Sequence, residues 1–73
     1  MLATPKHRRL LGEAIRASRK EAGLSQEGLA EKADLSTVFI SRIERGVEWP
    51  SLDNLVKVAK ALGVRVRNLV EQI

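Results

Sequence analysis

Five side chains between residues 37 and 45 recur at the spacing of one helix face and carry groups that can contact another molecule. They are Thr37, Val38, Ser41, Arg42 and Arg45. Ile40 and Ile43 fall on the opposite side of the same helix, because residues three and four apart share a face. An arginine can donate two hydrogen bonds to a guanine, and a Thr or Val methyl group can meet the methyl group of a thymine. With no acidic residue among them, the five predict a face that fits the major groove of DNA.

The position of each residue along this helix predicts its role. Residues near the N-terminus of such a helix reach deepest into the groove, so Thr37 and Val38 are predicted to meet base edges. Ser41 and Arg42 lie about one turn further on and can still reach the bases. Arg45 is nearer the end of the helix and is expected to contact phosphate. The alternatives are that Thr37 and Val38 only line the groove, and that Arg42 is an ordinary solvated arginine.

Gln26 is the predicted anchor to the DNA backbone on a second helix. It opens the helix expected at 26–33, so its amide lies beside backbone N–H groups that have no partner within the helix. Together with the positive end of the helix dipole, these groups can bind a phosphate. Contacts of this kind set the register of a protein on DNA rather than its sequence preference.

The charge balance agrees with a polyanionic partner. Thirteen Lys and Arg residues against nine Asp and Glu residues give a net charge of +4 on a chain of 73 residues. Such an excess favours a nucleic-acid partner but does not identify one. The grouping of cationic and hydrogen-bonding side chains on one helix face is what points to double-stranded DNA.

Other kinds of site lack their residues. The chain has no cysteine and a single histidine, His7, so it supports neither a thiolate metal site, nor a histidine-based metal or catalytic cluster, nor a nucleophile–base pair. It also has no glycine-rich loop of the kind that cradles phosphates. We therefore expect no catalytic residue, no metal, no cofactor and no enzymatic activity. A chain of this size leaves no room for an effector domain, so we expect no small-molecule effector.

No segment of the sequence predicts contact with a membrane. The apolar runs are a few residues long, far below the roughly 18 residues that cross a bilayer. The N-terminal residues are charged and lack the apolar region of a signal peptide. We expect a cytoplasmic protein that is associated with the nucleoid when it is bound to DNA.

Five helices with short connections are predicted, and they cover nearly the whole chain. Their ranges are 5–22, 26–33, 37–45, 52–62 and 66–72. Three start after a serine that can cap the helix, namely Ser25, Ser36 and Ser51. Three end at a glycine suited to the left-handed conformation, namely Gly23, Gly46 and Gly63, and Asp34 is expected to take that conformation between the second and third helices. We expect a single domain over 1–73, with residues 1–5 flexible.

Apolar residues at helical spacing predict the core. The inward residues of the first four helices are Leu11, Ala14, Ile15, Ser18, Ala22, Leu29, Ala30, Ala33, Ile40, Ile43, Leu52, Leu55, Ala59 and Leu62. Gly28 interrupts the second helix and should weaken it by about 1 kcal/mol relative to alanine.

The last helix offers more apolar surface than a short terminal helix needs within one molecule. Its apolar residues are Val66, Leu69, Val70 and Ile73. We predict that they form the interface of a symmetric dimer, which would place two copies of the helix 37–45 about one DNA turn apart, roughly 34 Å. The alternative is that the same residues close the core of a monomer.

Two short helices joined by a tight break form a helix-turn-helix unit, and several motifs around it arrive in a familiar order. They are residues 23–30 (GLSQEGLA), 40–46 (ISRIERG), 50–52 (PSL) and 59–64 (AKALGV). On these motifs the chain resembles the Cro/C1-type (XRE) helix-turn-helix family over roughly residues 11–70. The resemblance implies an all-α, compact, five-helix lambda-repressor-like DNA-binding domain that acts as a homodimer on a palindromic operator. It also implies that Gln26 binds phosphate and that Arg19 and Glu44 form an internal ion pair.

Within this family, a lone domain of this length is most similar to the controller proteins of restriction–modification systems. Small phage-type repressors and the antitoxins of toxin–antitoxin pairs, which repress their own operon, are the alternatives. A helical protein-interaction module that has kept the fold without binding DNA is a further alternative. The sequence departs from the family pattern at Asp34, where glycine is frequent, and at Arg65, where a Ser or Thr cap is usual.

Overall fold

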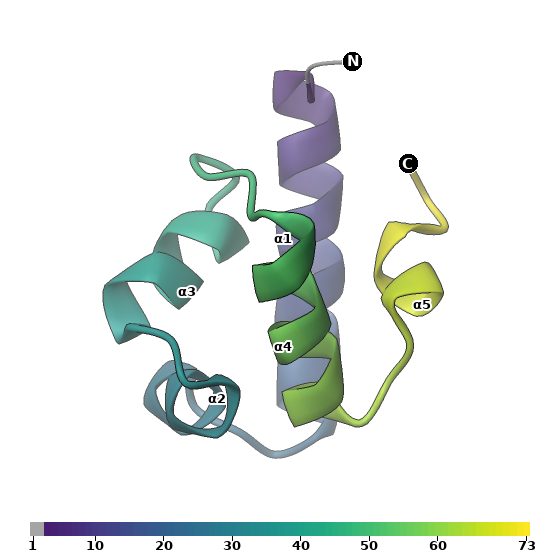
Figure 1. Ribbon diagram of the computed structural model, residues 1–73. Helices are drawn as coiled ribbons and strands as arrows, with labels where there is room; N and C mark the ends of the chain where they lie inside the picture. Colours follow the sequence, from purple (N-terminus) through teal and green to yellow (C-terminus); the bar gives the residue numbers. More distant parts are fainter. Residues whose placement is uncertain (1–2) are drawn as a thin grey trace.

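The helices lie close to their predicted positions. The computed structural model describes residues 3–73, and this part of the chain forms five α-helices and no strand. They are α1 (Pro5–Glu21), α2 (Gln26–Ala33), α3 (Thr37–Glu44), α4 (Leu52–Leu62) and α5 (Val66–Val70) (Figure 1). The predicted all-α fold is therefore confirmed, although α5 is shorter than the predicted range 66–72. Of the segment predicted to be flexible, residues 1 and 2 lie outside the described residues, and Pro5 already belongs to α1.

Hydroxyl side chains cap the first four helices. In each of them, a side-chain oxygen accepts a hydrogen bond from the backbone N–H three residues later, which gives a partner to a group that the helix leaves free. These caps are Thr4, Ser25, Ser36 and Ser51. Helix α5 lacks such a hydroxyl, and the side chain of Asn68 reaches back instead to accept from the backbone N–H of Arg65 at 3.0 Å.

The same four helices end alike, in the pattern known as the Schellman motif. A residue with positive φ follows each helix, and the next N–H bonds to a carbonyl five residues back. The residues with positive φ are Gly23, Asp34, Gly46 and Gly63. Asp34 has φ 57° and ψ 47°, which confirms the left-handed conformation predicted for it. These closures make the connections short and tie the direction of each helix to the one before it.

Helices α1 and α4 form the centre of the molecule, as Figure 1 shows. Helices α2 and α3 lie on one side of them and α5 on the other. Helix α3 contacts α1 and α2, α2 also contacts α4, and α5 packs against both α1 and α4. The predicted DNA-reading helix and the last helix are thus on opposite sides of the domain.

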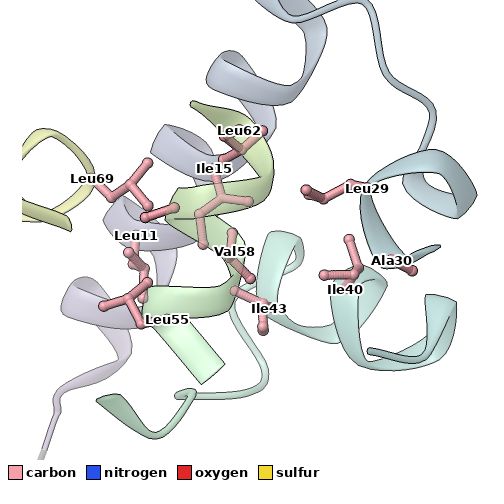
Figure 2. Close-up of a cluster of buried hydrophobic side chains, with 11 residues drawn as sticks. Leu11, Ile15, Leu29, Ala30, Ile40, Ile43, Leu55, Val58, Leu62 and Leu69 are labelled. Carbon is pink, nitrogen blue, oxygen red and sulfur yellow. The ribbon is translucent and has the colours of Figure 1, made fainter. Parts of the chain in front are cut away.

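The core is apolar and draws on every helix (Figure 2). Its members are Leu11, Ile15, Leu29, Ala30, Ile40, Ile43, Leu55, Val58, Ala59, Leu62 and Leu69. The prediction was wrong at Leu52, which is 70% exposed, and at Ala22, which is also exposed, and it omitted Val58, which is fully buried. Leu52 is the first residue of α4, and helical side chains lean toward the N-terminus, so it projects past the core while Val58 sits in the middle of the stripe.

Gly12 permits a close approach of α1 to the end of α3. A Cβ atom at this position would collide with the carbonyl oxygen of Ile43 and lie 2.7 Å from that of Glu44. Both are backbone atoms, which cannot move aside as a flexible side chain would. A residue with any side chain would therefore push the two helices apart.

No helix among residues 3–73 combines the length and the apolar character needed to span a membrane.

Candidate nucleic-acid interface

The turn between α2 and α3 is held by backbone and core together. Leu35 donates its N–H to the carbonyl of Ala30 at 2.9 Å, and its side chain packs against the core. Ser36 then caps α3 by accepting from the N–H of Phe39 at 3.0 Å. On the inner side of α3, Ile40 and Ile43 are buried. The orientation of α3 is therefore fixed from its first residue.

The outer side of α3 carries the five residues predicted to meet DNA. Thr37, Val38, Arg42 and Arg45 are exposed and Ser41 is partly exposed. Val38, close to the N-terminus of the helix, is an apolar residue that is nevertheless 68% exposed to solvent. Arg45 Nε donates to Ser41 Oγ at 3.3 Å, so these two side chains already lie together. The structure thus presents hydrogen-bonding, apolar and cationic groups on one continuous face.

The ion pair that the resemblance implies braces this face from behind. Arg19 Nε donates to Glu44 Oε2 at 2.7 Å and Arg19 Nη2 donates to Oε1 at 3.0 Å, a bidentate contact between α1 and α3. Arg19 Nη1 also donates to the carbonyl of Leu24 at 2.9 Å. The side chains are only 11% and 3% exposed. Hydrogen bonding to the Glu44 carboxylate raises the pKa of Arg19 above its usual value, against the opposing effect of burial.

Gln26 belongs to the same network, which the sequence did not reveal. Its Nε2 donates to Glu44 Oε1 at 3.1 Å, so the amide is held in place at the first residue of α2. An amide nitrogen carries two hydrogens, and the second can still be donated to a phosphate. Glu44 therefore links α1, α2 and α3 and orients the predicted backbone anchor.

A carboxylate that the sequence analysis missed lies beside the predicted readers. Glu48, in the loop between α3 and α4, accepts a hydrogen bond from Arg42 Nε at 3.1 Å. The prediction considered only residues within the helix and so found no acidic group on its outer face. The signal was present in Gly46, because a helix that ends in a left-handed glycine turns the following residues back toward itself.

The residues predicted to form a dimer interface do not all reach the surface. Val66 and Val70 are partly buried against the core, and Ile73 is 42% exposed. Leu69 is only 2% exposed and belongs to the core, so its assignment to an interface is corrected. The reason is that α5 packs against both α1 and α4, and Leu69 fills the space between them (Figure 2).

No group of three or more His, Cys, Asp or Glu side chains among residues 3–73 is placed to hold a metal ion. His7 has a structural contact instead. Its Nδ1 accepts from the backbone N–H of Thr4 at 3.4 Å, while Thr4 Oγ1 accepts from the N–H of His7 at 3.2 Å. This reciprocal arrangement closes the start of α1.

Comparison with known proteins places the same segment in a known family. A family model described as Helix-turn-helix matches residues 15–69. The control protein C.BamHI of Bacillus amyloliquefaciens is 45% identical over 65 residues, which are 88% of this chain and 80% of that protein. The immunity repressor of Bacillus phage phi105 is 48% identical over 60 residues, and the match covers 82% of this chain but only 42% of the repressor.

Solved structures agree with the sequence comparison. The restriction–modification controller protein C.AhdI from Aeromonas hydrophila superposes with a TM-score of 0.83 at 37% identity, covering 85% of this chain and 94% of that one. The SinR protein in complex with the SinI protein superposes with a TM-score of 0.82 at 40% identity, covering 85% of this chain and 61% of that one.

Proposed function

Because the chain belongs to the Cro/C1-type helix-turn-helix family, we propose that it is a transcriptional regulator that binds double-stranded DNA sequence-specifically, as a homodimer on a palindromic operator. The outer face of α3 is the observation that carries this proposal. It is exposed, cationic and hydrogen-bonding, and it sits on a helix that two other helices hold rigidly. Rigid support matters because base contacts require side chains at defined positions. The protein would act at DNA in the cytoplasm, in association with the nucleoid.

The side chains of this face divide by their reach. We assign Thr37, Val38, Ser41 and Arg42 to the base edges, since they occupy the first turns of α3. Gln26 and Arg45 contact the DNA backbone on either side of them. Gln26 is suited to this task because Glu44 already holds its amide in place, so little conformational freedom is lost on binding.

The dimer is assigned to the side of the molecule that carries α5. Ile73 is exposed there, and Val66 and Val70 are partly so. A contact through α5 leaves α3 free, because the two helices lie on opposite sides of α1 and α4 (Figure 1). A symmetric pair of this kind explains why an inverted repeat is the expected target.

Among regulators of this family, we favour a controller of a restriction–modification operon. The support is that similarity to controller proteins extends over most of both chains, 80% of C.BamHI and 94% of C.AhdI. The phage immunity repressor matches over less than half of its length.

Selection of bound duplexes from a random pool, followed by sequencing, tests the proposal. We expect enrichment of two inverted half-sites whose centres are about 10 base pairs apart, the spacing that a dimer with recognition helices one turn apart requires. The selection is repeated at several salt concentrations, because phosphate contacts alone give strongly salt-dependent binding without sequence preference. If the enriched pool shows no common sequence, the protein is not a sequence-specific regulator.

A further inference from the structure

We propose that Glu48 is a positioning residue that sets the specificity of DNA binding through Arg42. Its carboxylate holds the Arg42 guanidinium where it can meet a base, and it makes the recognition face less attractive to DNA of unrelated sequence. This inference rests on the proposed DNA-binding function. It starts from the ion pair in which Glu48 Oε1 accepts from Arg42 Nε at 3.1 Å.

The backbone fixes the position of Glu48 near α3. Gly46 has φ 76°, its N–H bonds to the carbonyl of Ile43 at 3.0 Å, and the N–H of Val47 bonds to that of Arg42 at 3.0 Å. Positive φ disfavours residues with side chains, and a Cβ on Gly46 would also lie 3.2 Å from the Cα of Arg9. These contacts reverse the chain directly after α3 and bring Glu48 back beside Arg42.

The geometry of the pair leaves the donors that read a base free. Glu48 bonds to Nε of Arg42, and among the described residues neither terminal nitrogen of that guanidinium has a hydrogen-bond partner. The two terminal nitrogens can donate to O6 and N7 of a guanine, the usual bidentate contact of arginine in the major groove. Arg42 can therefore keep Glu48 as a partner while it contacts a base end-on.

The charge of Glu48 affects two kinds of contact that Arg42 can make with DNA, one with a guanine base and one with a phosphate. A carboxylate on this face repels phosphates of any sequence, so it lowers affinity for all DNA. At the right base pair, the guanine contact compensates for this cost. At a wrong base pair, the terminal nitrogens of Arg42 have no guanine to contact, while Glu48 still holds the guanidinium at the base-reading position and repels the nearby phosphates, so the penalty falls mainly on nonspecific complexes.

A glutamine in place of Glu48 provides a test that the fold should tolerate. The side chains of Arg42 and Glu48 are 48% and 34% exposed, and ion pairs this open add little to folding stability. The dissociation constants of Glu48→Gln are measured for the selected operator and for a random duplex of equal length, each at several salt concentrations.

We expect random-sequence affinity to rise by up to about fivefold per subunit, the size that exposed ion pairs reach. Operator affinity should change less. The specificity ratio, which is the affinity for the operator divided by the affinity for the random duplex, therefore falls. The slope of log affinity against log salt for random DNA should steepen by about one unit for each Arg42 that gains a phosphate. The control is Glu21→Gln, which makes the same charge change at the last residue of α1, beside Leu62 and Val64. It should leave the ratio unchanged.

Two further variants show whether Glu48 acts through Arg42. In an Arg42→Ala background, Glu48→Gln should no longer change the specificity ratio. Glu48→Asp in the otherwise unchanged protein keeps the carboxylate, so it should retain part of the specificity that Glu48→Gln loses. An unchanged ratio in Glu48→Gln, an equal change in Glu21→Gln, or an undiminished effect without Arg42 would each overturn the inference. Equal binding of operator and random DNA by the unsubstituted protein would instead contradict the proposed function itself.

Discussion

The described residues contain three Arg–Glu ion pairs, and their surroundings give them different tasks. Arg19 and Glu44 are almost enclosed and join α1 to α3. Arg9 and Glu13 lie one turn apart on the exposed surface of α1. The third pair, Arg42 with Glu48, is half exposed beside the predicted DNA-reading face. Residue type alone does not distinguish these pairs, because burial determines whether an ion pair holds the fold together or remains available to a ligand.

Removing the carboxylate of Glu44 should destabilise the protein strongly. Glu44→Ala leaves the buried guanidinium of Arg19 and the amide of Gln26 without their partner, and we expect a loss of about 3 kcal/mol in the free energy of unfolding. Glu13→Ala is the matched control, since it breaks an exposed Arg–Glu pair and should cost less than about 0.5 kcal/mol. Urea denaturation monitored by circular dichroism measures the change in the free energy of unfolding for both variants. Equal, small losses in both variants would mean that the buried pair does not brace α3.

Arg42→Ala should weaken operator binding by about 1–3 kcal/mol and relax the preference at one base position of each half-site. The reason is that a base contact contributes only when the right base is present. Lys20, which is exposed on α1, provides a control with the same loss of charge. Titration of operator and random duplexes measures the effect. If the ratio of operator affinity to random-duplex affinity is unchanged in Arg42→Ala, Arg42 does not contact a base.

At the scale of the helices, replacing each of two glycines inside helical segments by alanine is expected to change stability in opposite directions. Gly12 lies in the middle of α1 and faces the backbone carbonyls of Ile43 and Glu44, whereas Gly28 lies in the first turn of α2 with only side-chain atoms nearby. Helix propensity predicts that either would be better as alanine. The contact between α1 and α3 reverses that expectation at Gly12.

Gly12→Ala is therefore expected to destabilise the protein. The methyl group collides with the backbone of α3, and overpacking of this kind costs about 1–3 kcal/mol even though alanine is the better helix former. Thermal unfolding monitored by circular dichroism measures the change. A more stable Gly12→Ala variant would show that α1 and α3 can separate without cost.

Gly28→Ala should have the opposite sign and stabilise the protein by about 0.5–1 kcal/mol. A Cβ here would meet Ser25 Oγ at 3.3 Å and the Leu24 side chain at 3.6 Å, and the Ser25 hydroxyl can yield slightly without losing its capping bond. The same unfolding experiment applies. If the variant is less stable than the parent, the methyl group has displaced the cap of α2.

At the scale of the whole molecule, the two contacts that we propose lie on different sides of the domain. Its longest dimension is 30 Å, and one turn of DNA spans roughly 34 Å. Two copies that meet near α5 can each place α3 about half a turn from the symmetry axis. The proposed DNA binding and the proposed dimerisation would therefore use different surfaces.

Ile73→Asp should weaken dimerisation by at least about tenfold, because it would place a charge in the proposed apolar contact, which symmetry repeats in the partner subunit. Ile73 is exposed, so the fold of the monomer should persist. Leu52→Asp, at an even more exposed leucine on α4, is the matched control and should leave the association unchanged. Sedimentation velocity over a range of concentrations gives the dimer dissociation constant. If Ile73→Asp associates as strongly as the unsubstituted protein, the dimer interface does not include the end of α5.

Local sequence patterns predicted the helices, their caps and the residues that share the outer face of α3. A serine before each of three helices, left-handed residues after four, and apolar residues at helical spacing all act between neighbours in the chain, so they can be read from it directly. The comparisons confirm the family and the fold that the motifs predicted. The roles of Thr37, Val38, Ser41 and Arg42 on DNA remain predictions.

Contacts between residues that are distant in sequence, or separated by a turn, could be seen only once the helices were packed together. The tertiary structure buried Leu69 and exposed Leu52, because the core ends where neighbouring helices end, and helical periodicity carries no information about that. It showed Gly12 to be a point of helix contact, tied Gln26 to Glu44, and brought Glu48 to Arg42. The physical reason is common to all of these cases: packing and charge pairing depend on which surfaces meet in space.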